Sequence, residues 1–290
     1  MTDKYAVIGN PIAHSKSPQI HEMFAQQTKQ DLSYEAVLAP LDGFAATVKR
    51  LRNEGYQGCN VTVPFKFEAF KLCTALTHRA TTAQAVNTLK FDGNEILGDN
   101  TDSVGLVADI EQNLGFALRG KHVLLLGAGG AAYGVALSLL NAGAMLTIAN
   151  RTKNKADVLV ETLRKMSQEN TAQKTGQINL IVGGLLLGSV RSRSYASLAG
   201  NKFYAVINAT SSGLSDEMPP LPPDIFAPGA LAYDLMYGTE TPFMKFAREQ
   251  GAAKVADGLG MLVEQAAEAF LLWRGVRPDT RPILAKLRQP

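Results

Sequence analysis

The chain has 290 residues, of which 46% are hydrophobic, and it carries a formal net charge of +3. This length accommodates about two domains with buried cores. Because the basic residues are scattered and form no long Lys/Arg run, the composition argues against a nucleic-acid-binding protein and leaves small anionic ligands as the expected partners.

Cysteine content and hydropathy indicate the compartment. Cys59 and Cys73 have no His or Cys at metal-ligand spacing, which predicts buried thiols in a reducing compartment and no metal site. The N-terminal residues lack the features of a secretory signal. The longest apolar tract, 178–190, contains three glycines and is shorter than the roughly 20 residues of a membrane helix. We expect a cytoplasmic protein without membrane contact.

The first hundred residues alternate short β patterns with helical ones, which predicts an α/β unit. The expected strands are 5–8, 34–38 and 59–63, and the expected helices are 18–28, 43–54 and 64–76. Ser17 followed by Pro18 is typical of an N-cap and a first helical position. The loop before it therefore lies at the end of the first strand, where open α/β sheets bind ligands.

A second domain is expected beyond this unit. Residues 89–97 read as a hairpin turning at Asp92-Gly93, and 102–114 read as a helix that leads out of the first domain. We predict a first domain over 1–104, completed by a C-terminal segment over 260–290, and a second domain over 105–259.

The second domain opens with a glycine-rich turn. An apolar strand pattern ends at Leu126, and Gly127-x-Gly129-x-x-Ala132 then leads into a helical pattern. This spacing provides a tight turn, bare backbone for a pyrophosphate and a small residue where helix and strand pack. It predicts a Rossmann-type dinucleotide site, the alternative being an ordinary strand-to-helix turn.

The next strand, 144–149, indicates which dinucleotide is bound. NAD enzymes place a carboxylate after this strand, but here Asn150-Arg151-Thr152 and then Lys155 follow. A guanidinium can pair with a 2′-phosphate, so we expect NADP(H) as cofactor. The alternative is a solvated basic loop.

The remaining segments complete two α/β domains. A polar stretch over 165–176 reads as a loose surface insertion, and a Pro-rich loop covers 219–228. Strands are expected at 204–209 and 231–236, and a long helix at 260–274 is expected to pack back on the first domain. Trp273 reads as a packing residue, and His14 and His21 read as loop or helix-surface histidines.

Several polar residues are candidates for proton transfer and substrate binding. Lys66 and Thr62 flank the proline that ends a predicted strand, and Asp102 lies at the domain boundary. Lysine is a credible acid/base when its surroundings adjust its proton affinity, although an ordinary surface lysine and an N-cap aspartate are the simpler readings. Ser15 and Ser17 precede a helix and provide hydroxyls for a carboxylate.

Taken together, these segments resemble the shikimate dehydrogenases, NADP-dependent enzymes that reduce 3-dehydroshikimate to shikimate in aromatic amino acid biosynthesis (the chorismate pathway). The matching motifs appear in the family's order over nearly the whole chain: 9–18, 60–66, 85–88, 99–102, 127–131, 150–152, 208–211, 233–237 and 257–265.

The resemblance implies roles for individual residues. It makes Lys66 the acid/base and Asp102 the residue that orients it. Substrate contacts are implied for Ser15, Ser17, Thr62, Asn87, Tyr237 and Gln265. Cofactor contacts are implied for Gly127, Ala128, Gly129, Gly130 and Ala131 at the pyrophosphate, for Asn150, Arg151, Thr152 and Lys155 at the 2′-phosphate, and for Leu235, Gly258 and Met261 at the nicotinamide. The resemblance leaves monomer and homodimer open.

The chain departs from the family pattern in places. Lys155 stands where arginine is common, Ser103 where glycine is usual, and His78 where an acid is frequent, while 165–201 is longer than expected and suggests no function. Two alternatives are a quinate/shikimate dehydrogenase with relaxed cofactor use and a noncatalytic NADP(H)-responsive regulator. Ser17 and Arg151 argue against the first, and the presence of Lys66 and Asp102 argues against the second.

Overall fold

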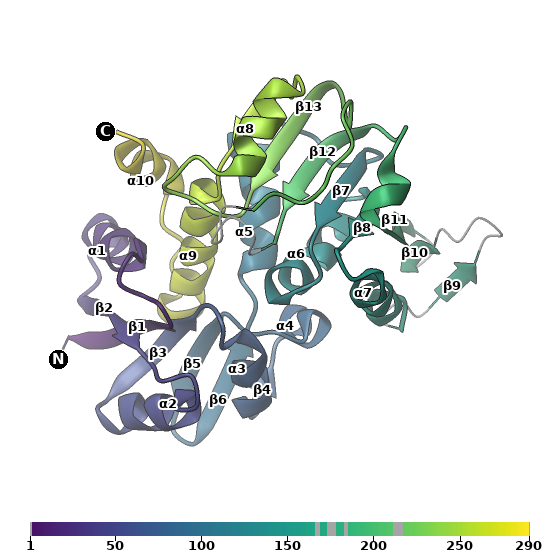
Figure 1. The fold of residues 1–290 in the computed structure, drawn as a ribbon. Coiled ribbons are helices and arrows are strands. Elements are labelled where there is room, and N and C mark those ends of the chain that lie inside the picture. The colour runs from purple at the N-terminus through teal and green to yellow at the C-terminus, as the bar shows by residue number, and fades with distance from the viewer. Residues whose placement is uncertain (1, 166–168, 173–177, 183–184, 211–216, 290) are drawn as a thin grey trace. The chain divides into compact units, whose positions relative to one another are not determined.

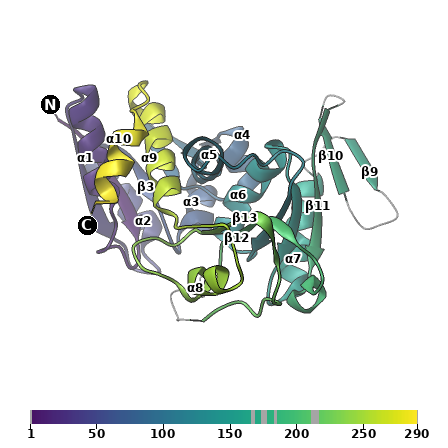
Figure 2. The ribbon, with the colours of Figure 1, turned by 90° about the horizontal axis from the view of Figure 1, so that it is seen from above.

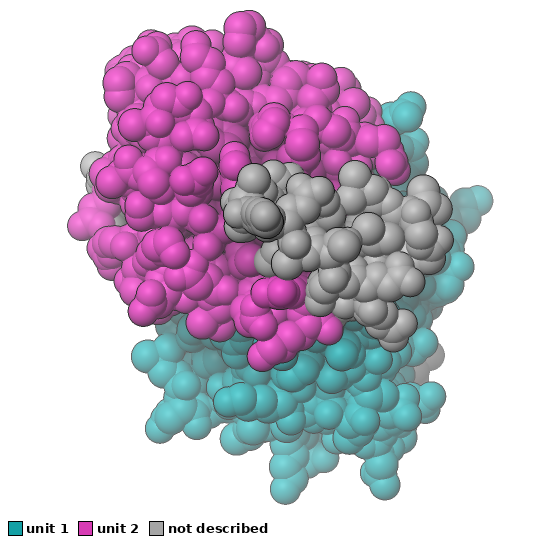
Figure 3. Space-filling model, turned by 90° about the vertical axis from the view of Figure 1, so that its right-hand side faces the viewer, with its two compact units in different colours: residues 1–106, 262–290 teal, residues 107–261 magenta. Residues whose placement is uncertain are grey.

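The computed structural model describes residues 2–165, 169–172, 178–182, 185–210 and 217–289. The chain divides into two compact units, coloured separately in Figure 3. Unit 1 comprises residues 1–106 and 262–290, and unit 2 comprises residues 107–261. Each unit has its own sheet, so the chain folds as two α/β domains.

Unit 1 is built on a six-stranded mixed sheet with the order β2-β1-β3-β5-β6-β4 (Figure 1). The strands are β1 (Asp3–Gly9), β2 (Leu32–Leu38), β3 (Tyr56–Val61), β4 (Ala75–Leu76), β5 (Thr88–Asp92) and β6 (Glu95–Asp99). The helices that lie wholly within the unit are α1 (Ser17–Thr28), α2 (Phe44–Asn53), α3 (Lys66–Leu72), α4 (His78–Ala83) and α10 (Thr280–Leu287).

The C-terminal helices complete the core of unit 1. From Leu262 onward, α9 (Leu259–Arg274) belongs to this unit, and it runs beside α1 in Figures 1 and 2. Ile20 and Phe24, one helical turn apart on α1, pack against Val263 and Phe270 of α9. On the sheet itself, Trp273 stacks on Tyr5 and donates a hydrogen bond to the carbonyl of Leu89. Trp273 is therefore a packing residue, as predicted.

Unit 2 is a doubly wound sheet with the order β14-β13-β12-β7-β8-β11-β10-β9. Its strands are parallel except β10, which is antiparallel to both neighbours. The strands are β7 (His122–Leu126), β8 (Met145–Ala149), β9 (Glu169–Ala172), β10 (Ile178–Val182), β11 (Leu185–Arg193), β12 (Phe203–Asn208), β13 (Phe226–Asp234) and β14 (Lys254–Ala256). Its helices are α6 (Gly130–Asn141), α7 (Lys153–Lys165) and α8 (Pro242–Glu249), and the turn of 3-10 helix η2 (Tyr195–Leu198) follows β11.

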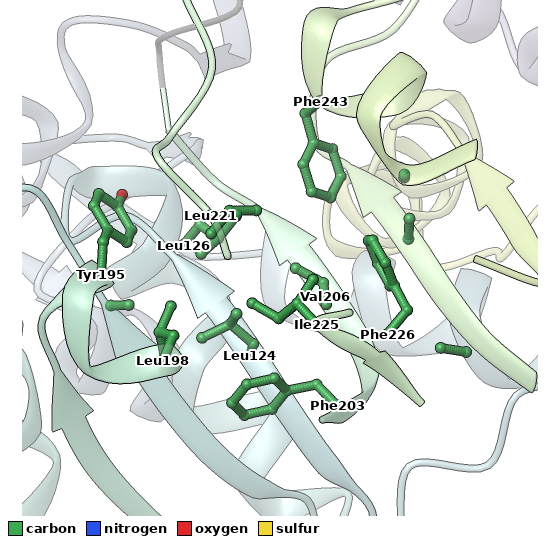
Figure 4. Close-up of a cluster of buried hydrophobic side chains, with 14 of the residues drawn as sticks. Leu124, Leu126, Tyr195, Leu198, Phe203, Val206, Leu221, Ile225, Phe226 and Phe243 are labelled. Carbon is green, nitrogen blue, oxygen red and sulfur yellow. The ribbon is translucent and has the colours of Figure 1, made fainter. Parts of the chain in front are cut away.

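Buried aromatic and branched residues fill one core of unit 2. Figure 4 shows Leu124 and Leu126 of β7 alongside Val206 of β12 and the rings of Phe203 and Phe226. Parallel strands covered on both faces read as continuous apolar runs, which is why 123–126 lacks polar alternation. This packing fixes β7, β8 and β12, and so positions the loops that follow their carboxyl ends.

The connection between the units begins in α5 (Asp102–Ala108), which continues directly into η1 (Asp109–Asn113), one turn of π-helix. The predicted helix over 102–114 is therefore present. Among the described residues, no helix is both long and apolar enough to cross a bilayer.

Some predicted boundaries were wrong. The helix expected over 64–76 spans only 66–72, because Thr74 bonds to Ile96 and 75–76 join the sheet as β4. The strand expected over 59–63 ends at Val61. The hairpin turns at Gly93-Asn94, between β5 and β6.

The polar stretch over 165–176 was also misread. Residues 169–172 form β9, an edge strand paired with β10. Lys165 is the last residue of α7, and 166–168 and 173–176 lie outside the described residues.

Candidate functional site

Lys66 and Asp102 form an ion pair at the end of the unit 1 sheet. Lys66 is the first residue of α3, Asp102 is the first residue of α5, and Nζ lies 2.6 Å from Oδ2. The exposed fractions of the two side chains are only 15% and 9%. A largely buried, charge-assisted contact of this length holds both groups in one geometry. Neither the surface-lysine reading nor simple N-capping accounts for this pair.

The Asn87 side chain connects this pair to α9. Its amide nitrogen donates to Oδ1 of Asp102 at 3.0 Å and to Oε1 of Gln265 at 3.2 Å. Its amide oxygen accepts from the backbone N–H of Thr101 at 2.8 Å. Asn87, Thr101 and Gln265 are all buried. Unit 1 thus brings together four predicted residues, Lys66, Asp102, Asn87 and Gln265, from segments far apart in the sequence.

Ser15 and Thr62 lie on the loops that follow β1 and β3, and Ser17 is the first residue of α1. The N–H of Ser17 donates to Oγ of Ser15 at 3.3 Å, and the N–H of Thr62 donates to the carbonyl of Ile8 at 2.9 Å. Gly9 allows the two loops to meet, since a Cβ there would lie 2.5 Å from Cγ2 of Thr62. Ser17 is not the N-cap that the sequence predicted. Lys16 is the N-cap and makes no side-chain capping bond, and Ser17 is the first residue of α1.

A chain of ion pairs supports the same edge of unit 1. Arg79 makes two bonds to the buried carboxylate of Asp99, at 2.7 and 2.5 Å, and a third to Glu268 of α9 at 2.9 Å. Asp99 also accepts from the backbone N–H of Asn100, which fixes the loop that leads to Asp102. Arg79 was not predicted from the sequence, because a single arginine on a short helix carries no signal of its partner.

His21 is fully buried, so the helix-surface reading was wrong for it, whereas His14 is exposed in its loop. The His21 ring stacks on the ring of Tyr34, with centroids 4.1 Å apart. Within the described residues neither ring nitrogen has a hydrogen-bond partner. Burial lowers the pKa of His21 to about 3, so the ring is neutral at physiological pH.

We expect His21 to make the protein acid-sensitive. The unfolded chain takes up a proton near pH 6.5 but the folded one does not until about pH 3, so stability is lost as the pH falls through this range. The loss amounts to about 1.4 kcal/mol per pH unit. Between pH 7.5 and 5.0, the free energy of unfolding of His21→Phe should fall by about 2 kcal/mol less than that of the starting protein, since phenylalanine keeps the stacking. Urea denaturation at the two pH values measures this difference.

The matched control for His21→Phe is His78→Gln, which changes an exposed histidine of the same unit. If His21→Phe and His78→Gln show the same acid dependence, proton uptake by His21 does not set the acid sensitivity.

The glycine-rich turn of unit 2 has the geometry that the sequence predicted. Gly127 has φ +106°, and a Cβ there would lie 2.9 Å from the carbonyl oxygen of Ala209. Gly129 is the N-cap of α6, with nothing within 4 Å of a built Cβ. Ala132 is fully buried against the sheet. The turn therefore leaves open backbone in front of a helix N-terminus, which suits a pyrophosphate.

Basic residues gather after β8, the next strand. Asn150 and Arg151 follow its last residue, and the side-chain amide of Asn150 donates to the carbonyl of Thr152 at 3.0 Å. The exposed side chains of Arg151 and Lys155 form no ion pair with a carboxylate of the described residues, whereas Lys153 is paired with Asp157.

Strand β11 adds two arginines to this region that were not predicted from the sequence. In the parallel pairing of β11 with β8, Arg191 lies opposite Thr147 and Arg193 opposite Ala149, so Arg193 lies beside the start of the Asn150 loop. Nε of Arg191 donates to Oγ1 of Thr147 at 3.1 Å. Burial and the neighbouring charge of Arg193 lower the pKa of Arg191. The Arg-x-Arg spacing was the available signal, but the strand could not be placed from sequence.

Leu235, Gly258 and Met261 form a third group, at the carboxyl end of β13. A Cβ on Gly258 would lie 2.2 Å from the carbonyl oxygen of Leu235, so only glycine fits. The N–H of Met261 donates to the hydroxyl of Tyr233, which donates to the buried Asp109. Tyr237 follows on the loop after β13 and is half-buried. The described residues contain no cluster of three or more His, Cys, Asp or Glu that would hold a metal ion.

Comparison with known proteins gives the family. The profile of the shikimate dehydrogenase substrate binding domain matches residues 7–89, that of shikimate / quinate 5-dehydrogenase matches 109–181, and that of the shikimate 5'-dehydrogenase C-terminal domain matches 258–288. The shikimate dehydrogenase (NADP(+)) of Methylobacillus flagellatus is 58% identical over 287 residues, covering 99% of each chain. The chain belongs to the shikimate dehydrogenase family.

Other known proteins are also similar to this chain over their full length. The relative from Dechloromonas aromatica is 56% identical and covers 99% of this chain, which covers 98% of it. The solved shikimate 5-dehydrogenase of Thermus thermophilus, in complex with NADP(H) and shikimate, is 31% identical with a TM-score of 0.82, and the match covers 99% of each chain. An Ael1 enzyme from Pseudomonas putida is 47% identical with a TM-score of 0.86, covering 100% of this chain and 99% of the other.

Proposed function

We propose that this chain catalyses the reversible, NADP-dependent reduction of 3-dehydroshikimate to shikimate. Relatives at 58% and 56% identity carry this activity in their names, and they match the chain along its whole length. The observation that carries the proposal is the largely buried Lys66–Asp102 pair, held by Asn87 within a ring of hydrogen-bonding side chains. A lysine held by a carboxylate can give a proton to a carbonyl oxygen and take it back.

In the proposed reaction NADPH, when bound, supplies the hydride that reduces the carbonyl carbon. The Lys66 ammonium donates its proton to the carbonyl oxygen, which becomes the hydroxyl of shikimate. Asp102 keeps Lys66 in place and accepts a hydrogen bond from a neighbouring hydroxyl of the ring. In the reverse direction, neutral Lys66 removes the hydroxyl proton, and the hydride would pass from the same carbon to bound NADP⁺.

The proposed substrate contacts follow the polar groups of unit 1. The hydroxyls of Ser15 and Ser17, next to the start of α1, bind the carboxylate. Thr62, Asn87 and Gln265 bind ring hydroxyls or the carboxylate, as does Tyr237 of unit 2. Asn87 and Gln265 present both donors and acceptors, which matches hydroxyl groups.

The proposed cofactor contacts lie in unit 2. The backbone from Gly127 through Ala128, Gly129 and Gly130 to Ala131 binds the pyrophosphate, which the open turn before α6 accommodates. Asn150, Arg151, Thr152 and Lys155 bind the 2′-phosphate. Leu235, Gly258 and Met261 contact the nicotinamide.

We assign substrate binding to a domain of residues 1–104 with 260–290 and cofactor binding to residues 105–259. The reaction is placed in the cytoplasm, which the free thiols of Cys59 and Cys73 support, since such thiols persist in reducing compartments.

The proposal is tested by measuring the reduction of NADP⁺ and NAD⁺ by the purified protein, with shikimate and with quinate, at one pH. Selective turnover of shikimate with NADP⁺ is the expected result. Comparable efficiency with quinate or NAD⁺ would place the chain with the broader quinate/shikimate enzymes. NADP(H) binding without any turnover would favour a noncatalytic regulator.

The position of Arg193 leads to a prediction about cofactor choice. Because Arg193 lies opposite Ala149, directly before Asn150 and Arg151, we expect it to strengthen the positive field at the 2′-phosphate. Arg193→Ala should raise the Kd of NADPH about threefold to tenfold, and raising the salt concentration should shrink this effect. Kd values of NADPH and NADH are measured by titration. An equal change for both cofactors would rule out a 2′-phosphate effect.

A further inference from the structure

We propose that Tyr34, Asn60 and Thr88 are positioning residues, which form a one-directional chain of hydrogen bonds that orients the Asn87 amide toward Asp102. The inference rests on the proposed function and deepens it, because it names residues that act on the reacting groups without touching the substrate.

The chain of hydrogen bonds follows neighbouring strands of unit 1. The hydroxyl of Tyr34, on β2, donates to Oδ1 of Asn60, on β3, at 2.7 Å. Nδ2 of Asn60 donates to Oγ1 of Thr88, its cross-strand neighbour on β5, at 3.0 Å. Oγ1 of Thr88 donates to Oδ1 of Asn87 at 2.9 Å. Asn87 then donates to Asp102, which pairs with Lys66.

Each donor in this chain of hydrogen bonds donates to the next residue in the direction of the Asp102 carboxylate. Bonds aligned in one direction polarise one another, so the chain strengthens the last donor, the Asn87 amide. The opposite orientation of the Asn87 amide would place its oxygen against the Asp102 carboxylate and its nitrogen against the N–H of Thr101. The Thr88 hydroxyl and the Thr101 N–H therefore hold the amide in one of its two orientations.

The middle residues of this chain of hydrogen bonds are shielded from water. Asn60 and Thr88 are 5% and 0% exposed, so water cannot replace a lost partner cheaply. Burial also raises the pKa of Tyr34 well above its ordinary value, so its hydroxyl keeps the proton that it donates. The proton at the start of the series is thus present throughout the working pH range.

The decisive variant is Thr88→Val, which removes the hydroxyl with little change in shape. We expect kcat for shikimate oxidation to fall about tenfold, with the KM for NADP⁺ unchanged. Thr88→Ser, which restores the hydroxyl, should recover most of the loss. The matched control is Thr47→Val on α2. The hydroxyl of this buried threonine bonds, among the described residues, only to the carbonyl of Gly43.

Two further variants separate positioning from folding. In an Asn87→Ala background, Thr88→Val should lower kcat no further, because its effect passes through the Asn87 amide. Tyr34→Phe keeps the stacking on His21 and removes only the first donor. It should lower kcat about twofold to threefold, and it stands in for Thr88→Val if that variant fails to fold.

A readout that needs no activity completes the test. In NMR spectra of uniformly labelled protein, the side-chain amide protons of Asn87 should shift in Thr88→Val and Tyr34→Phe but not in Thr47→Val. If the Asn87 signals do not move, or if Thr88→Val keeps the kcat of Thr47→Val, the positioning role is overturned. A wild-type protein without turnover would reject the proposed reaction alone, and the NMR result would still decide the orientation of Asn87.

Discussion

Lys66→Ala is expected to lower the kcat of shikimate oxidation by about 10²- to 10⁴-fold, the range that a general acid/base supplies. The variant removes the group that exchanges the proton and leaves Asp102 without the cation 2.6 Å from its Oδ2. Binding of shikimate should persist, because Ser15, Asn87 and the other proposed contacts remain. Steady-state kinetics and calorimetric titration with shikimate measure the two effects separately.

The control for Lys66→Ala is Lys71→Ala, which removes an exposed lysine from the last turn of the same helix, α3. We expect Lys71→Ala to keep the parent kcat. Near-parental turnover in Lys66→Ala would remove this lysine from the mechanism. Loss of shikimate binding to the same extent as kcat would instead make Lys66 a binding residue.

Arg151→Ala should weaken NADPH binding by roughly one to two decades and leave NADH binding almost unchanged. A charge-assisted hydrogen bond contributes about 1.5–3 kcal/mol, and about 1.4 kcal/mol corresponds to a factor of ten. Arg151 follows β8 at the point where dinucleotide-binding folds read the ribose, and no carboxylate of the described residues pairs with it. Fluorescence titration of both reduced cofactors gives the two Kd values.

Lys153→Ala tests whether the effect of Arg151 is specific. It removes a positive charge from the same connection, but from a lysine that is already paired with Asp157 at 2.8 Å. We expect NADPH affinity to change little in this variant. Equal losses for NADPH and NADH in Arg151→Ala would refute the assignment to the 2′-phosphate.

Local signals in the sequence predicted much of the fold. The glycine spacing identified the turn before α6, and continuous apolar runs identified the buried parallel strands of unit 2. The helix over 260–274 was placed nearly to the residue. These features depend on neighbouring residues, so a single sequence contains the information.

Features that depend on distant partners could not be predicted. The helix after Pro64 stops at Leu72 because Thr74 finds Ile96 across the sheet, and nothing near Thr74 announces that contact. The neighbours of Ser17 suggest an N-cap, yet Lys16 holds that position and Ser17 lies inside the helix. Strand β9 is too polar to read as a strand, and its pairing with β10 decides its structure.

The same distinction applies to the candidate site. Lys66 and Asp102 were predicted because their motifs resemble those of a family. Arg79, Asn60 and Thr88 were not, since their contacts join segments that only the folded sheet brings together. Arg193 was missed because the strand that carries it could not be placed.

The burial of Cys59 makes its alkylation a measure of local opening in unit 1. This thiol, next to Asn60 on β3, is fully buried, and burial raises its pKa far above the ordinary value. An alkylating reagent therefore reaches a reactive thiolate at Cys59 only when the sheet of unit 1 separates. The rate of alkylation at Cys59 therefore measures how often the sheet opens. Saturating shikimate should slow this rate according to the stability that binding adds to unit 1.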